Sequence, residues 1–314
     1  MKQTDAIAVT RAEYEAGAAY MDGRFMPVGE AAIPVMDGGY RRSDVTYDVV
    51  GVWDGNFFRL DDHICRFRAS MNALRMEPGE SDDQIKAILN RLVAMAGLRN
   101  AYVSMECLRG APVPGLPRHP ANARSYLCCI AIPWLSVASD EMFRRGMHLI
   151  VSSVQRIPPE SVDPTVKNFH WGDLTRAMFE ARDAGADNAV LLDAEGNVTE
   201  GPGFNVMCII DGKVISPIRG ALEGVTRASV FELCSELGIP TEVRDLHVNE
   251  FREADEIFTC TTAGGIMPAS RLDGRIMNND APGPISARLR SLFWDKRAEG
   301  WHATPVDYSV AQDS

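Results

Sequence analysis

The sequence predicts an α/β protein, of the α+β type with mixed sheets, that is divided into two domains. Its 314 residues exceed the size of one typical domain, which is roughly 100–200 residues. Strand-like and helical patterns alternate along the chain, and a polar stretch follows a proline at 133–142. We therefore expect a smaller N-terminal domain over 1–134, a linker over 135–142 and a larger C-terminal domain over 143–314.

The N-terminal part predicts two β-hairpins, followed by two helices and two more strands. Asp22-Gly23 and Asp54-Gly55 each lie between apolar runs, a pattern that favours a tight turn between strands. Apolar residues then recur at helical spacing, and the second of the two helices has Ser81 or Asp82 as its cap and Gly97 as its end. The expected helices and the strands that follow them cover 60–76, 81–98, 100–110 and 124–135.

The loop between the last two of these strands, 111–123, is rich in proline, glycine and arginine. It is long for a simple connection, and loops of this kind tend to be lids or binding loops. Beyond the linker, the expected strands and helices alternate over 146–157, 171–185, 188–217, 226–238, 241–248, 249–254, 255–262 and 284–300.

Composition excludes several classes of protein. The net charge of −11 gives no electrostatic reason to bind nucleic acid or an anionic membrane. No apolar run reaches the roughly 18–20 residues of a membrane span, and the N-terminus lacks an apolar signal core, so we expect a cytoplasmic protein. The seven cysteines show no C-x-x-C spacing and predict buried thiols. The six histidines form no H-x-H or H-x-x-x-H pair, so no metal is expected.

Lysine is scarce, which shortens the search for a nucleophilic amine. The lysines are Lys2, Lys86, Lys167, Lys213 and Lys296. Four of them fall in a terminus, a turn or helices with solvent faces, whereas Lys167 follows a proline-rich approach and has apolar and aromatic neighbours. A desolvated lysine loses pKa and can form Schiff bases. The alternative is a lysine that packs its stem and keeps its amine in solvent.

Two further motifs favour contacts with a charged ligand. Glu200 follows a strand and enters a glycine-rich turn, where it is either a functional acid or a capping acid. Gly224-Val225-Thr226 begins a helix, and free N–H groups at a helix start attract anions. Thr226 as an ordinary N-cap is the alternative there.

Two more motifs carry hydroxyl and guanidinium groups. Thr261 and Thr262 end a strand beside small residues and suit phosphate or carboxylate contact, with a simple turn as the alternative. Arg66 lies one helical turn past a possible cap at Asp61 or Asp62, and an ordinary surface ion pair would also explain it.

The order of these blocks resembles the fold-type IV pyridoxal-phosphate aminotransferases. Glu200 follows Lys167 by 33 residues, and G-V-T at 224–226 and T-T-A-G-G at 261–265 come after it. The block L-D-D-H-I-C-R-F at 60–67 matches the arginine-bearing helix of the same family. The resemblance extends from about residue 18 to about residue 310 and implies the two-domain architecture of that family.

The resemblance implies a role for each matched residue. Lys167 would hold pyridoxal 5′-phosphate covalently and then move a proton, and Glu200 would pair with the pyridine nitrogen. The phosphate group would be bound by one arginine, by the start of a helix and by two hydroxyls. These residues are Arg66, Val225, Thr226, Thr261 and Thr262.

The substrate-binding blocks resemble those of the (R)-selective amine transaminases. Alternation along a strand puts Tyr47, Val49 and Gly51 on one face, and a second pocket strand carries Tyr102 and Ser104. Branched-chain aminotransferases typically have a carboxylate-binding arginine at the position of Ser104. They also usually have a tyrosine where this chain has Gly172, and the Arg-x-His motif of the D-amino-acid enzymes is missing at Arg118-His119. A pocket without such a clamp favours amines with two carbon substituents.

The chain also departs from the amine-transaminase pattern. Arg42 stands where many of those enzymes have histidine, Ser104 stands where several have an acid, and the loop arginine that meets the keto acid is not at its usual place. We expect Arg118, with Arg124 or Arg42 as alternatives, to take that role. Trp171 and Ala263 complete the implied pocket, although core packing is an equal alternative for Trp171.

The sequence thus predicts a homodimeric enzyme that moves the amino group of an (R)-configured primary amine to a keto acid such as pyruvate. Three alternatives remain: a branched-chain or D-amino-acid aminotransferase, a lyase similar to aminodeoxychorismate lyase, and a noncatalytic anion-binding module that retains only the phosphate site.

Overall fold

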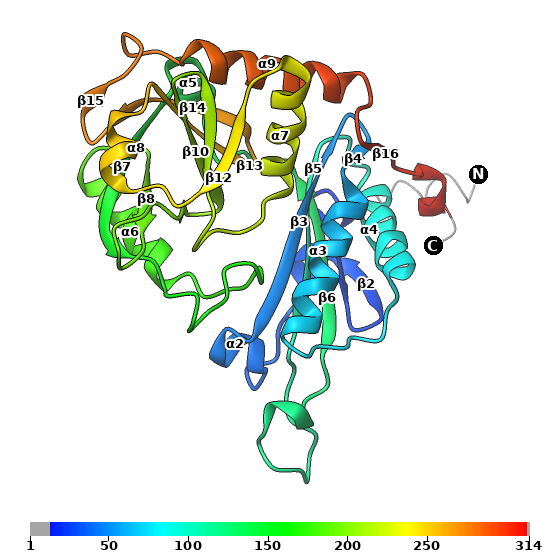
Figure 1. Cartoon of the computed structure of the whole chain (residues 1–314). Helices are drawn as coiled ribbons and strands as arrows, with labels where there is room; N and C mark the ends of the chain where they lie inside the picture. Colours follow the sequence, from blue (N-terminus) through cyan, green and yellow to red (C-terminus); the bar gives the residue numbers. More distant parts are fainter. Residues whose placement is uncertain (1–12, 313–314) are drawn as a thin grey trace. The chain divides into compact units, whose positions relative to one another are not determined.

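The computed structural model describes residues 13–312, which form two compact units (Figure 1). Unit 1 contains residues 13–135 together with 166–169 and 300–312, and unit 2 contains residues 136–165 and 170–299. Each unit is built on one large sheet. Because helices accompany both sheets, and one sheet mixes parallel with antiparallel pairs, the expected fold class is confirmed.

The division of the chain differs from the expected domains in three respects. The first unit ends at Leu135, inside the expected linker, but that linker also holds the start of helix α5 (Asp140–Arg145), which Ser139 caps. The expected C-terminal domain loses residues 300–312 to unit 1, because Ala303 pairs with Phe58. It also loses the segment around Lys167, 166–169, because Asn168 forms a β-bridge with Thr46.

Unit 1 contains a sheet of seven antiparallel strands in the order β16-β4-β3-β5-β6-β1-β2. The two expected hairpins are present as β1–β2 and β3–β4, with Asp22 and Asp54 at positive φ in their turns. The strands are β1 (Ala18–Met21), β2 (Arg24–Pro27), β3 (Val45–Trp53), β4 (Asn56–Phe58), β5 (Ala101–Leu108), β6 (Tyr126–Pro133) and β16 (Ala303–Pro305).

Helices α3 (Leu60–Ala73) and α4 (Asp82–Ala96) cover one face of this sheet. Their apolar stripes, which include Phe67 and Leu89, pack on strand residues such as Met105 to form the core. As expected, Ser81 caps α4 and Gly97 ends it at positive φ. The short helices of this unit are η1 (Val28–Glu30), α2 (Gly38–Arg42), η2 (Pro120–Asn122) and η3 (Tyr308–Gln312).

Strand alternation gives the sheet of unit 1 two chemically different faces. Val50 and Val103 belong to the core with the helices, and Asp48 contacts α3 from the same face of β3. Successive side chains of a strand point to opposite faces, so Tyr47 and Val49 lie on the face opposite to the helices. This second face carries the candidate substrate residues.

Unit 2 contains a mixed sheet whose main path is β12-β11-β10-β13-β14-β7-β8, with β9 paired to β10 and β15 paired to β14. Its strands are β7 (Met147–Gln155), β8 (Asn188–Leu192), β9 (Glu200–Gly201), β10 (Phe204–Ile210), β11 (Lys213–Pro217), β12 (Thr241–Arg244), β13 (Glu256–Thr261), β14 (Gly265–Leu272) and β15 (Arg275–Ile276). Its remaining helices are α6 (Gly172–Asp183), α7 (Val225–Leu237), α8 (Val248–Glu253) and α9 (Pro284–Ala298).

Several elements were not expected from the sequence. Strand β14 carries Pro268, and proline has no N–H for a ladder, which argues against a strand interior. Pro268 lies opposite Phe258 of β13 and directly before Ala269, where the pairing with β7 begins, so it stands at the end of the β14–β7 ladder rather than inside it. Helix α2 carries two glycines, which lower helix propensity, and Asp37 starts it by accepting the N–H of Gly39.

Within residues 13–312, no helix combines the length and the apolar composition needed to cross a bilayer. The same residues contain no group of three or more histidine, cysteine, aspartate or glutamate side chains that could hold a metal ion. Six of the seven cysteines are buried as expected, whereas Cys65 is exposed on α3.

Candidate active site

Lys167 lies against the N-terminal half of β3 in unit 1. Its carbonyl oxygen accepts hydrogen bonds from the N–H of Tyr47, at 3.1 Å, and from Oγ1 of Thr46, at 2.8 Å. Its own N–H donates to Oγ of Ser70 at 3.3 Å. Three hydrogen bonds therefore fix the backbone of this lysine, so its side chain starts from a defined point on the strand edge.

The amine of Lys167 lies against the side chain of Tyr47. Nζ donates to Oη of Tyr47 at 3.2 Å and lies 4.3 Å from the centroid of the same ring. The ring of Phe169 contacts that of Tyr47, with centroids 4.7 Å apart. Three other lysines form ion pairs with acids, namely Lys86 with Asp61, Lys213 with Glu242 and Lys296 with Glu236, and Lys2 lies outside the described residues. Lys167 is thus the lysine in the chemical setting that the sequence favoured.

Arg66 pairs with a buried acid rather than forming the surface pair that was the alternative. Its Nε and Nη2 donate to Oδ2 and Oδ1 of Asp48 at 2.7 and 2.8 Å, and Nδ1 of His63 lies 2.8 Å from Oδ1. The side chain of Asp48 is fully buried. The expected cap at Asp61 or Asp62 is wrong, because α3 begins after Arg59 and these acids lie within its first turn.

In unit 2, Glu200 has both carboxylate oxygens engaged. Oε1 accepts from Nη2 of Arg156 at 2.9 Å, and Oε2 accepts from the N–H of Leu222 at 2.9 Å. Nη1 of Arg156 donates to Oδ2 of Asp173 at 2.7 Å, and all three charged side chains are buried. These contacts hold the carboxylate of Glu200 in one orientation.

The start of α7 has the features of an anion site. Its N-cap is Gly224, without a side-chain cap, so the alternative of Thr226 as the N-cap is wrong. A Cβ at Gly224 would lie 1.9 Å from Oδ1 of Asn205, so the backbone approach requires glycine. Thr226 is buried in the first turn, and its hydroxyl makes no hydrogen bond within residues 13–312. Helix N–H groups and a hydroxyl are thus available to an anion.

The remaining expected residues of unit 2 lie at the ends of strands and helices. Thr261 ends β13 and Thr262 follows it, both partly exposed, and the carbonyl of Ala263 accepts the N–H of Val137. Trp171 packs on the apolar cluster of α6 and β8, in agreement with its core-packing alternative.

The expected site residues are divided between the two units. Unit 1 holds Tyr47, Val49, Gly51, Arg66, Tyr102, Ser104, Arg118 and Lys167. Unit 2 holds Trp171, Glu200, Val225, Thr226, Thr261, Thr262 and Ala263.

The strand register brings the expected substrate residues of β3 and β5 together. Val49 pairs with Ser104 and Gly51 pairs with Tyr102, so these residues share one face of the sheet. On the same face Tyr47, which holds the amine of Lys167, pairs with Glu106. Sequence reasoning had missed Glu106, although its spacing of two from Ser104 was a signal that could have found it.

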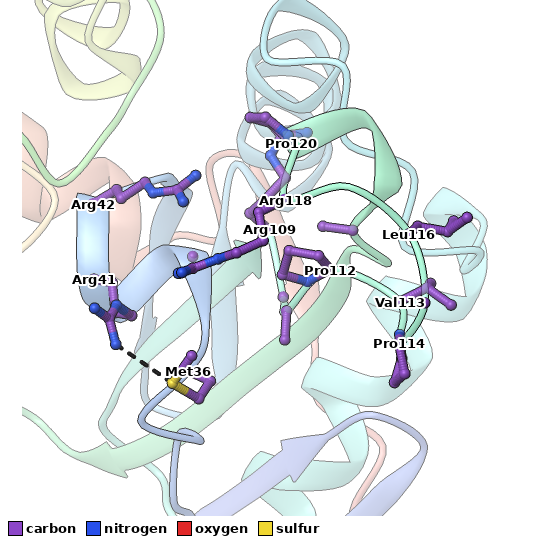
Figure 2. A pocket seen from close by; sticks show the side chains of 15 residues that line it. Met36, Arg41, Arg42, Arg109, Pro112, Val113, Pro114, Leu116, Arg118 and Pro120 are labelled. Carbon is purple, nitrogen blue, oxygen red and sulfur yellow. Dashed lines mark hydrogen bonds between the residues drawn. The ribbon is translucent and has the colours of Figure 1, made fainter.

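A cavity of about 280 Å³ in unit 1 is lined by α2 and by the loop after β5 (Figure 2). Arg42 and Arg118 both line it, and neither makes a hydrogen bond or an ion pair with any residue that the structure describes. Arg109, also in the lining, is engaged with Asp44. Arg124 does not line the cavity and instead pairs with Asp22. Two of the three expected acceptor arginines are thus available in one cavity.

Four buried titratable residues near the matched blocks were also missed. They are Asp48, His63, Arg156 and Asp173. Asp48 was detectable as one acid within the apolar strand segment V-T-Y-D-V-V, and His63 lies within the matched block 60–67. The pairing of these residues could not be predicted, because a sequence does not state which charges meet across a sheet and a helix.

The chain belongs to the class IV amino-transferases, because the model of that family matches residues 46–272. A putative branched-chain-amino-acid aminotransferase of Methanocaldococcus jannaschii is 31% identical over 89% of this chain and 96% of its own length. The D-alanine aminotransferase of Bacillus licheniformis is 26% identical, with 87% of this chain and 94% of its own length covered.

Solved structures agree with the family assignment. The branched-chain amino acid aminotransferase of Thermobaculum terrenum, solved in its PLP form, is 28% identical and superimposes with a TM-score of 0.82. The match covers 94% of this chain and 99% of the solved one. The expected fold-type IV architecture is therefore confirmed.

Class IV amino-transferases depend on pyridoxal 5′-phosphate, so the expected cofactor is confirmed as well. The residues present fit this group. The amine that Tyr47 holds suits the aldehyde of the cofactor. A buried carboxylate with fixed oxygens suits the pyridine nitrogen, and an uncapped helix start with a free hydroxyl suits the phosphate.

Proposed function

We propose that the protein is an (R)-selective amine transaminase that transfers the amino group of a primary amine to a keto acid such as pyruvate. One observation carries this proposal. The sheet face that bears Tyr47 has no basic side chain on β3, β5 or β6, because Ser104 and Glu106 occupy the face of β5. A fixed clamp for the α-carboxylate of an amino acid is therefore missing from this face, and an uncharged substituent fits there better.

When bound, pyridoxal 5′-phosphate supplies an electron sink that makes the hydrogen on the amine-bearing carbon acidic. Lys167 would hold the cofactor and then move that proton with its Nζ, which Tyr47 orients by hydrogen bonding. Arg66 would bind phosphate with the guanidinium that Asp48 fixes. In unit 2, Val225, Thr226, Thr261 and Thr262 would donate hydrogen bonds to phosphate, and Glu200 would keep the pyridine nitrogen protonated.

The keto acid brings a carboxylate that the amine donor lacks, so an arginine must bind it in only one half-reaction. Arg118 is the proposed residue, with Arg42 as the alternative, because both line the cavity beside α2 without an ion pair. Arg124 is disfavoured by its pairing with Asp22. An arginine without a carboxylate partner binds a new carboxylate without first breaking an existing pair.

A comparison of amino donors tests the proposal. The purified protein, loaded with pyridoxal 5′-phosphate, is given (R)- and (S)-1-phenylethylamine, D- and L-alanine, and D- and L-leucine, with pyruvate or 2-oxoglutarate as the acceptor. We expect the highest kcat/KM for (R)-1-phenylethylamine. A preference for L-leucine or D-alanine would contradict the proposal and favour a branched-chain or D-amino-acid aminotransferase, the activities that the names of the relatives support.

A lyase and a noncatalytic module would each give a separate signature. Release of pyruvate without any amino acceptor would indicate a lyase. Failure of borohydride to attach the cofactor to Lys167 would indicate a noncatalytic anion-binding module, and Lys213, which pairs with Glu242, supplies the matched control position for mapping the adduct. Sedimentation of the loaded protein tests the proposed homodimer.

A further inference from the structure

Glu106 stands out on the candidate substrate face as an acid without a basic partner. It pairs across the sheet with Tyr47 on one side and with Cys128 on the other. Tyr102 and Ser104 lie four and two positions before it on β5, and these even spacings put all three on the same face. Glu106 is therefore the one acid among the face residues of β3, β5 and β6.

The carboxyl group of Glu106 has few hydrogen-bond partners for a group that is largely removed from solvent. Its one hydrogen bond within the described residues is from the neutral hydroxyl of Ser104 to Oε1, at 3.0 Å, and it makes no ion pair there. Burial raises the pKa of Glu106, although the Ser104 hydroxyl acts in the opposite direction. The titratable groups that face it, Tyr47, Tyr102 and Cys128, are neutral in their ordinary protonated forms, so none of them compensates a negative charge.

This setting discriminates between ligand charges. A cation next to a partly desolvated carboxylate restores the charge pairing that the protein does not provide, whereas a second carboxylate adds repulsion between like charges. The phenol rings of Tyr47 and Tyr102 also attract cations to their faces. The amine of Lys167 lies against one of these two rings, so a donor that reacts there extends over the same face as Glu106.

We propose that Glu106 is a specificity-determining residue that favours amine donors with a second ammonium group and disfavours donors with a carboxylate. The inference rests on the proposed function, since it requires an amine as the donor. It adds a substrate class, the diamines, to the neutral amines considered above. It also gives a physical reason for weak activity towards amino acids, because their carboxylates would meet a negative charge.

Three donors of equal chain length test this inference: pentylamine, 1,5-diaminopentane and 5-aminopentanoate. In the wild-type holoenzyme, we expect kcat/KM to be highest for the diamine and lowest for the amino acid. In Glu106→Gln, the ratio of diamine to pentylamine should fall about tenfold, the size of one charged hydrogen bond, and the ratio of 5-aminopentanoate to pentylamine should rise. The exposed Glu77→Gln is the matched control and should change neither ratio.

The outcomes separate this inference from the function on which it rests. Turnover of (R)-1-phenylethylamine together with unchanged ratios in Glu106→Gln would overturn the role of Glu106 alone. No turnover of any amine by the wild type would overturn the proposed function itself. If Glu106→Gln does not fold, the donor preference of the wild type still tests the inference. Equal kcat/KM values for 5-aminopentanoate and the diamine would contradict it.

Discussion

Asp48 illustrates how a single buried residue organises the chemistry of unit 1. Burial by itself would raise the pKa of its carboxyl, but Arg66 and His63 outweigh burial and hold that pKa well below its usual range. Burial also lowers the pKa of His63, so the imidazole is neutral near neutral pH. The carboxylate therefore balances one guanidinium and fixes its orientation.

Replacing Asp48 by asparagine should destabilise the protein by about 3 kcal/mol at pH 7, because the largely buried guanidinium of Arg66 loses its counter-charge. Urea unfolding measures the change. The control is Asp54→Asn, since Asp54 forms an exposed pair with Arg99, and solvent screens such a pair so that it contributes little to stability. Equal effects of the two substitutions would contradict the role of Asp48.

The pair of Asp48 and Arg66 makes the stability of the protein depend on pH, with a sign that follows from the lowered pKa of Asp48. A carboxyl whose pKa is lowered by folding contributes stability above its unfolded pKa of about 3.9, and this contribution is lost as the pH falls towards the folded value. The difference in unfolding free energy between the wild type and Asp48→Asn should therefore shrink below about pH 4. A difference that stays constant from pH 7 to pH 3 would exclude this linkage.

At the residue scale, the sequence predicted which residues are candidates for the site better than it predicted which side chains contact them. Lys167 stood out because its neighbours were apolar and aromatic, and the structure adds the hydroxyl of Tyr47 that holds its amine. Arg66 was recognised by its block, but its buried partner Asp48 belongs to another element. A linear pattern carries local polarity, whereas ion pairs depend on which elements pack together.

At the scale of elements, periodicity and turn residues predicted most helices and hairpins. The Asp-Gly turns and the Ser81 cap are confirmed because their signals are local. The expected loop 111–123 contains the short helix η2. Together with α2, this loop lines the cavity that holds Arg42 and Arg118. Helix α2 was missed, and with it the reason why Arg42 and Arg118 line the same cavity.

The arrangement of this loop leads to a prediction about the keto acid. Arg118→Ala should raise the pyruvate concentration for half-saturation about tenfold while turnover at saturation changes little, because one charged contact to the acceptor carboxylate is lost. Arg124→Ala, which breaks only the exposed pair with Asp22, is the matched control. An unchanged pyruvate half-saturation in Arg118→Ala would contradict the assignment. A higher half-saturation in Arg42→Ala instead would assign the role to Arg42.

At the scale of the whole molecule, the end of the chain completes the fold of unit 1. Strand β16 extends the sheet beyond β4, Val306 is buried, and Oη of Tyr308 donates to the carbonyl of Leu98. The C-terminal segment therefore acts as part of the N-terminal unit, although about 130 residues of unit 2 precede it in the sequence.

A chain that ends at residue 299 should consequently lose roughly 3 kcal/mol of stability, since it gives up the buried Val306, the partly buried Tyr308 and an edge strand. Thermal unfolding compares it with the full chain and with Val306→Ala, which removes one buried side chain and should cost less. Unfolding of the truncated chain at the same temperature as the full chain would contradict this role.

The sequence by itself determined the class of fold, the family and the cofactor, because these depend on periodicity, turn chemistry and the order of short blocks along one chain. Only the tertiary structure decided that the lysine segment and the C-terminus join unit 1, that Asp48 holds Arg66, and that Arg42 and Arg118 share a cavity. Those facts depend on strand register and on contacts between distant segments, and the free energy of such contacts is not a property of any local stretch of sequence.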